Sequence, residues 1–148
     1  MLADLIRRLA NPSIDDRPLD QEDARVAVAG LLVAAAHADH NYEAAEREQI
    51  DRALALRYNL SEAAAARLRE EGEEAERAAA DLYRFTSLIK ASVPHEERIA
   101  VIEALWRVML ADRVREMHEE TMMRRVTDLL GLDPRASIEA RRRIEGEG

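Results

Sequence analysis

The 148-residue chain contains no cysteine, so disulfide bonds, thiolate catalysis and cysteine-based zinc sites are all excluded. Aromatic residues make up only 3% of the sequence, whereas hydrophobic residues make up 47%. A core with so few rings has to be filled by Ala, Leu, Ile, Val and Met, which favours packed helices over a sheet. Only five glycines and four prolines are present to interrupt them. The composition therefore predicts one all-α domain that spans residues 1–148.

Basic residues are fewer than acidic ones, with 22 Lys and Arg against 30 Asp and Glu and a net charge of −8. This balance argues against a general binder of nucleic-acid phosphates, and it suits a cation or a basic partner. The most apolar segment, residues 26–38, is too short to cross a bilayer, and the N-terminus lacks the charge order of a secretory signal. We therefore expect a cytoplasmic protein with no membrane insertion. A protein partner, or a second copy of the chain in a homo-oligomer, is compatible with the sequence.

Hydrophobic periodicity, cap residues and prolines together predict eight helices. The two at 21–38 and 95–111 are the most apolar, and we expect them to be the central pair of the bundle. Ser61 is predicted to cap the start of one helix, and Gly131 to follow the end of another. The remaining helices are predicted at 2–9, 62–80, 81–91 and 134–144, with two more around residues 50–58 and 123–130.

Two further predictions concern packing. The segment from Arg69 to Arg77 is heavily charged, and we expect this face of its helix to be solvated. Trp106, the only tryptophan, lies on the same apolar stripe as Ile102 and Met109. We expect it to be buried where the two central helices meet, because a side chain of this size dominates a core with so few rings.

The most informative pattern is a repeat, in which residues 38–60 are echoed by residues 111–132. In both copies a long apolar helix ends in Ala-Asp, a short polar break follows, and a Glu stands seven positions after the Asp. The equivalent acids are separated by 73 positions, since 112 minus 39 and 119 minus 46 give the same number: Asp39 and Asp112, Glu46 and Glu119. We predict an internally duplicated helical bundle, with repeats at 24–60 and 97–132 that follow an N-terminal helix and loop over 1–20.

The repeated acids can be interpreted in three ways. Asp39 and Asp112 end helices whose macrodipole is already negative there, so a divalent cation such as Ca²⁺ or Mg²⁺ would relieve the repulsion by binding their carboxylates and those of Glu46 and Glu119. Alternatively, the acids are helix caps and first-turn residues in a structural protein–protein interaction module without a metal. A metal-assisted hydrolase is the third reading, although nothing in the sequence marks a nucleophile or an oxyanion hole.

At these residues the chain resembles the TerB-like family, which is named for tellurite resistance. The resemblance rests on LLVAAAHAD (31–39) with its Glu46, DLYRFTSLIK (81–90), EERIAVIEALW (96–106), and ADxxxxxxEE with MRRVTDLLGL within 111–132. It is closest to the stand-alone bacterial branch. The resemblance implies an all-helical duplicated fold, and a non-enzymatic protein of the stress or tellurite response. It also implies a metal-binding role for the four repeated acids.

The segments from Asp39 to Glu46 and from Asp112 to Glu119 form the first and second acidic corners, and one departure from the family pattern affects the second. The family's loops usually read Ala-Asp-Gly, and here His40 and Arg113 stand in place of the glycine. Glycine permits a left-handed turn and a close approach of the backbone to an ion. Arg113 also brings a positive charge that offsets Asp112, so we expect the second corner to be the weaker cation site.

Overall fold

The computed structural model describes residues 2–11, 17–38, 42–111 and 117–146, apart from the side chains of 117–119. These residues form helices and no strand, which confirms the all-α prediction. The helices are α1 (Leu2–Ala10), α2 (Gln21–Ala38), α3 (Ala44–Tyr58), α4 (Glu62–Ala78), α5 (Leu82–Ser92), α6 (His95–Ala111), α7 (Met117–Leu129) and α8 (Pro134–Gly146). Of these described helices, none combines the length and the apolar composition needed to span a bilayer.

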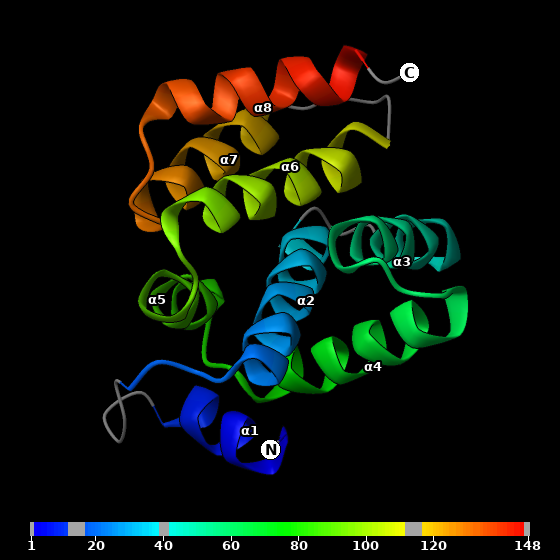
Figure 1. The fold of residues 1–148 in the computed structure, drawn as a ribbon, viewed down its shortest axis with the longest axis vertical. Coiled ribbons are helices and arrows are strands. Elements are labelled where there is room, and N and C mark those ends of the chain that lie inside the picture. Colours follow the sequence, from blue (N-terminus) through cyan, green and yellow to red (C-terminus); the bar gives the residue numbers. More distant parts are fainter. Residues whose placement is uncertain (1, 12–16, 39–41, 112–116, 147–148) are drawn as a thin grey trace.

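The helices form two groups, each built around one apolar helix (Figure 1). Helix α2 contacts α1, α3, α4, α5 and α6, while α6 contacts α7 and α8 as well as α2 and α3. The two helices predicted as the central pair, α2 and α6, are therefore the helices around which the two groups are built. In the view of Figure 1, α6, α7 and α8 lie together at the top, and the chain ends lie at opposite ends of the molecule.

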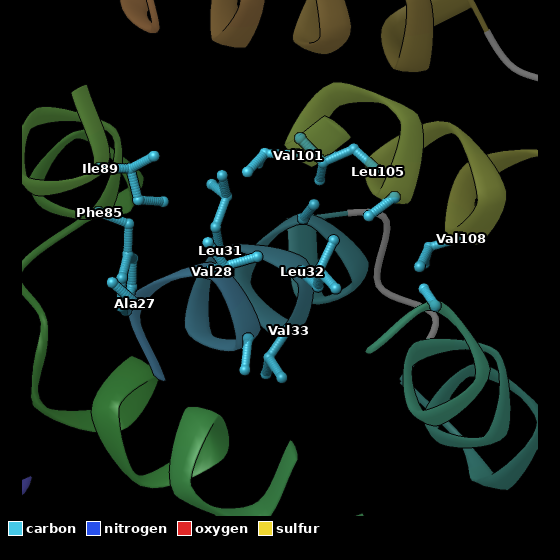
Figure 2. Packing of buried hydrophobic residues seen from close by; sticks show 14 of the residues in the cluster. Ala27, Val28, Leu31, Leu32, Val33, Phe85, Ile89, Val101, Leu105 and Val108 are labelled. Carbon is cyan, nitrogen blue, oxygen red and sulfur yellow. The ribbon is translucent and has the colours of Figure 1, made fainter. Parts of the chain in front are cut away.

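The core is continuous through both groups because α2 is buried on nearly every side. Every residue of α2 from Val26 to Val33 is buried. Figure 2 shows Leu31 of α2 facing Val101 of α6, while Phe85 of α5 lies against Ala27. Burial of a side chain such as Leu or Phe stabilises the fold by roughly 1.5–3 kcal/mol. These apolar contacts hold the two groups together.

Local signals set the helix ends as predicted. The Ser61 hydroxyl accepts a hydrogen bond from the Ala64 amide at 3.2 Å at the start of α4. Gly131 follows α7 with φ of +72°, the left-handed conformation that glycine adopts without strain. Asp133 accepts from the Arg135 amide at 2.8 Å, directly before the proline that begins α8.

Gly72 lies inside α4, where glycine usually weakens a helix, but it is buried against α2. A Cβ added at Gly72 would lie 2.7 Å from the Cβ of Ala29 and 2.8 Å from its carbonyl carbon. A side chain at this position would therefore collide with the backbone of the central helix. Gly72 allows α4 to pack closely on α2.

The prediction for Trp106 is correct on burial and wrong on its partner. Its side chain is 5% exposed, but its indole N–H donates to Ser137 Oγ of α8 at 3.1 Å. The guanidinium of Arg141, also in α8, lies 5.0 Å from the ring centroid. Helix α6 is apolar on two faces, and Figure 2 shows the side chains of Val101 and Leu105 on the side toward α2. Periodicity locates such faces but does not say which neighbour each one meets.

The helix bounds agree with the predicted repeat. Helices α2, α3 and α4 begin at 21, 44 and 62, and α6, α7 and α8 begin at 95, 117 and 134, so the offsets are 74, 73 and 72. In each set the first and second helices both contact the third. The duplication remains a prediction, and superposition of these two three-helix units is the measurement that would decide it.

Candidate functional site

The structure describes the side chain of only one of the four predicted cation ligands. Asp39 and Asp112 lie outside the described residues, as do their neighbours His40 and Arg113. Glu119 belongs to α7, but its side chain also lies outside the described part. Glu46 is described, in the first turn of α3. The geometry of the first corner is therefore built from Glu46 and from the residues on either side of 39–41.

The carboxylate of Glu46 lies at the N-terminal end of α3. Its Oε1 accepts a hydrogen bond from the Glu43 amide at 3.0 Å, in the arrangement of a capping box. Negative charge is favourable at this position because the helix macrodipole is positive there. Glu46 thus has a structural role that the sequence anticipated as one alternative. The same bond keeps its carboxylate at the end of α3 that faces the corner.

Glu73 of α4 is the centre of a polar network beside this corner. The Tyr42 hydroxyl donates a hydrogen bond to Glu73 Oε2, and Arg69 Nη1 lies 3.2 Å from the same oxygen. Arg47 Nε of α3 is 3.8 Å from it. One carboxylate oxygen therefore joins the residue that follows the corner to both α3 and α4.

A two-point ion pair between α3 and α4 supports this network. Arg69 Nε lies 2.8 Å from Asp51 Oδ1, and Arg69 Nη2 lies 3.5 Å from Asp51 Oδ2. The side chain of Arg69 is only 15% exposed. Its hydrogen bond to Asp51 is the largest effect that raises the pKa of Arg69, with Glu73 contributing in the same direction. The pairing holds the two helices together through paired N–H donors.

The prediction that the face from Arg69 to Arg77 is solvated is therefore partly wrong. Glu70, Glu74 and Arg77 are exposed, but the side chains of Arg69 and Glu73 are 15% and 19% exposed and face α3. From the sequence alone, charged residues of a helix are interpreted as a solvated face, because their partners on a neighbouring helix are not known. Asp51 and Arg69 are 18 positions apart, and Tyr42 and Glu73 are 31 apart.

His37 precedes the corner in the sequence and Tyr42 follows its undescribed residues, and the two side chains are in contact. Their ring centroids are 4.4 Å apart, and His37 Nδ1 lies 3.2 Å from Glu76 Oε2. Burial is the main effect that raises the pKa of the Tyr42 hydroxyl, and its hydrogen bond to Glu73 adds to it. Together with Arg47, Arg69 and Glu73, these side chains line a cleft of about 620 Å³.

Three acids in or beside this cleft are paired within the protein. Asp51 and Glu73 are held by Arg69, and Glu76 lies beside His37. Within the described residues, no group of three or more His, Cys, Asp or Glu side chains is arranged to hold a metal ion. These three carboxylates belong to a structural network that joins the residues on either side of the corner to α3 and α4.

A family model described as tellurite resistance protein TerB matches residues 25–142. The chain belongs to the TerB family. The match spans both corners, and so includes all four repeated acids as well as the Tyr42–Glu73 network. Searches of curated proteins and of solved structures found no match. Membership confirms the family resemblance and the helical fold of this TerB protein.

Proposed function

We propose that this TerB protein is a non-enzymatic protein that binds a divalent cation, Ca²⁺ or Mg²⁺, at the corner between α2 and α3. Asp39 and Glu46 are the carboxylate ligands in this proposal. Asp112 and Glu119 form a weaker second site, because Arg113 offsets the charge of Asp112. A role in a stress or tellurite response is part of the same proposal and rests on the family alone.

The observation that carries the proposal is the position of the Glu46 carboxylate. It lies at the start of α3, next to the corner that contains Asp39, and its bond to the Glu43 amide is 3.0 Å long. A carboxylate has about four lone-pair positions, so one hydrogen bond from an amide leaves capacity for an ion. Hard divalent cations prefer such oxygen ligands, and backbone carbonyls at the C-terminal end of α2 suit them as well.

The experiment is a thermal unfolding series with millimolar CaCl₂ or MgCl₂, supported by titration calorimetry. A ligand that binds only the native state stabilises it by RT ln(1 + [L]/Kd), so a weak site still raises Tm when the ion is in large excess. Asp39→Asn should remove most of this increase, and Asp112→Asn should remove less. Glu48→Gln is the matched control, because it removes one exposed negative charge from the same helix as Glu46.

Two variants at Glu46 separate cation binding from capping. Gln at this position of a capping box still accepts the Glu43 amide bond, so Glu46→Gln should retain apo stability and lose the ion-dependent increase. Glu46→Ala should lose about 0.5–2 kcal/mol of apo stability as well. If ions change neither Tm nor heat in the wild type, and Asp39→Asn lowers apo stability by about 1 kcal/mol or more, then the acids are caps. The chain is then a structural interaction module.

A further inference from the structure

Helix α4 holds the chain on both sides of residues 39–41. Before this segment, Nδ1 of His37 lies 3.2 Å from Oε2 of Glu76. After it, the hydroxyl of Tyr42 donates a hydrogen bond to Oε2 of Glu73. Glu73 and Glu76 are three positions apart in α4, so they lie on the same face of this helix. These two carboxylates form what we call the α4 clamp.

The two residues that the α4 clamp holds also contact each other. The ring centroids of His37 and Tyr42 are 4.4 Å apart. The guanidinium of Arg47 lies 5.3 Å from the centroid of the Tyr42 ring, so this ring is contacted from α3 as well. Tyr42 is therefore the residue at which α2, α3 and α4 meet. A chain segment whose ends are held together has already lost part of its conformational entropy before a ligand binds.

The acceptor of the Tyr42 hydroxyl is itself fixed. Arg69 Nη1 lies 3.2 Å from Glu73 Oε2, and the side chain of Glu73 is only 19% exposed. Arg69 is held in turn by its two-point pair with Asp51 of α3. An exposed glutamate keeps several rotamers and would restrict a partner very little. Glu73 can instead fix the position of Tyr42 relative to α3 and α4.

We infer that the α4 clamp preorganises the first corner for its cation, with Tyr42 as the positioning residue through which it acts. Asp39 and Glu46 are the ligands of the proposed cation site, on which this inference rests. Tyr42 supplies no carboxylate to the ion, but it fixes the chain between these two ligands. Ligands that are already ordered lose less entropy when they bind, so the site has a higher affinity. The coupling is reciprocal, and an ion at the corner strengthens its attachment to α4.

Hydrogen–deuterium exchange of the ion-free protein and calorimetry with CaCl₂ or MgCl₂ test this role. Tyr42→Phe removes the hydroxyl and keeps the ring beside His37. Exchange in peptides that cover residues 36–47 should become about three- to tenfold faster, as expected when one hydrogen bond that opposes local opening is lost. Ion affinity should fall by a similar factor at a temperature where both proteins are folded. Tyr83→Phe is the matched control on α5, and it should change neither measurement, because Tyr83 is 52% exposed.

Two further variants separate positioning from a general loss of stability. Ser137→Ala removes the acceptor of the Trp106 indole N–H in the second unit. It should lower global stability and leave both the exchange of residues 36–47 and the ion affinity unchanged. Glu73→Ala removes the acceptor of the Tyr42 hydroxyl. In that background Tyr42→Phe should have no further effect on either measurement, because the two residues act as one unit.

Equal exchange in wild type and Tyr42→Phe would overturn the inference, and so would equal ion affinity. A Tyr42→Phe effect that persists in the Glu73→Ala background would also overturn it. A wild type that binds no ion contradicts the proposed function instead. Faster exchange in Tyr42→Phe would in that case still support the α4 clamp as the element that fixes the corner.

Discussion

Replacing Gly72 with alanine sets two effects of opposite sign against each other. In an isolated helix the change is stabilising by about 1 kcal/mol, because alanine is the best helix former and glycine is among the poorest. In this fold the new methyl group would lie 2.7 Å from the Cβ of Ala29, 2.8 Å from its carbonyl carbon and 2.9 Å from the Gly30 amide nitrogen. These are mostly backbone atoms of a helix that is buried from Val26 to Val33, so they cannot rotate away.

The methyl group can fit only if α4 moves away from α2. Overpacking of a well-packed core costs about 1–3 kcal/mol, and a collision with backbone belongs in the upper part of that range. After the gain in helix propensity is subtracted, we expect Gly72→Ala to lower the free energy of unfolding by about 1–2 kcal/mol. For a chain of this length that corresponds to a Tm lower by roughly 2–8 °C.

Urea unfolding followed by circular dichroism at 222 nm measures this loss, with a thermal scan as a second estimate. Gly146→Ala is the matched control, since an added Cβ there meets nothing within 4 Å. This control should change stability by less than about 0.5 kcal/mol. A Gly72→Ala protein that is as stable as the wild type, or more stable, would show that the close approach of α4 to α2 is wrong.

Two further predictions concern single side chains. Trp106→Ala should cost about 3–5 kcal/mol, because it empties a buried site and leaves Ser137 without its donor; a loss below about 1 kcal/mol in urea unfolding would contradict its burial. Tyr42→Phe should cost about 1 kcal/mol through the lost bond to Glu73. The raised pKa of Tyr42 means that the folded protein keeps this proton above pH 10 while the unfolded chain loses it. Wild-type stability should therefore fall as pH rises above about 10, and Tyr42→Phe should reduce that slope.

The parts of the fold that local signals control could be predicted from the sequence. The bounds of α2 and α6 match the predicted ones at both ends, because each helix is a long apolar segment between a cap or proline and a polar break. The roles of Ser61 and Gly131 follow from the chemistry of one residue and its immediate neighbours. The family acids were also recognised by local pattern, and the match to TerB spans all of them.

What the sequence could not supply is the contact between helices. The partner of Trp106 depends on which apolar face of α6 meets α8, and that is decided by the packing of the whole bundle. The Tyr42–Glu73 and Asp51–Arg69 interactions join residues that no helical period relates. Only Arg69–Glu73, an i,i+4 pair, carries a signal that local reading could have found.

Both three-helix units have an ion pair where their second and third helices meet. In the first unit, α3 and α4 are joined by Asp51 and Arg69, and Gly72 brings α4 close to the central helix. In the second unit, Arg141 of α8 lies 3.0 Å from Glu120 of α7. In the first unit the Asp51–Arg69 pair fixes α3, and with it the corner acid Glu46, against α4.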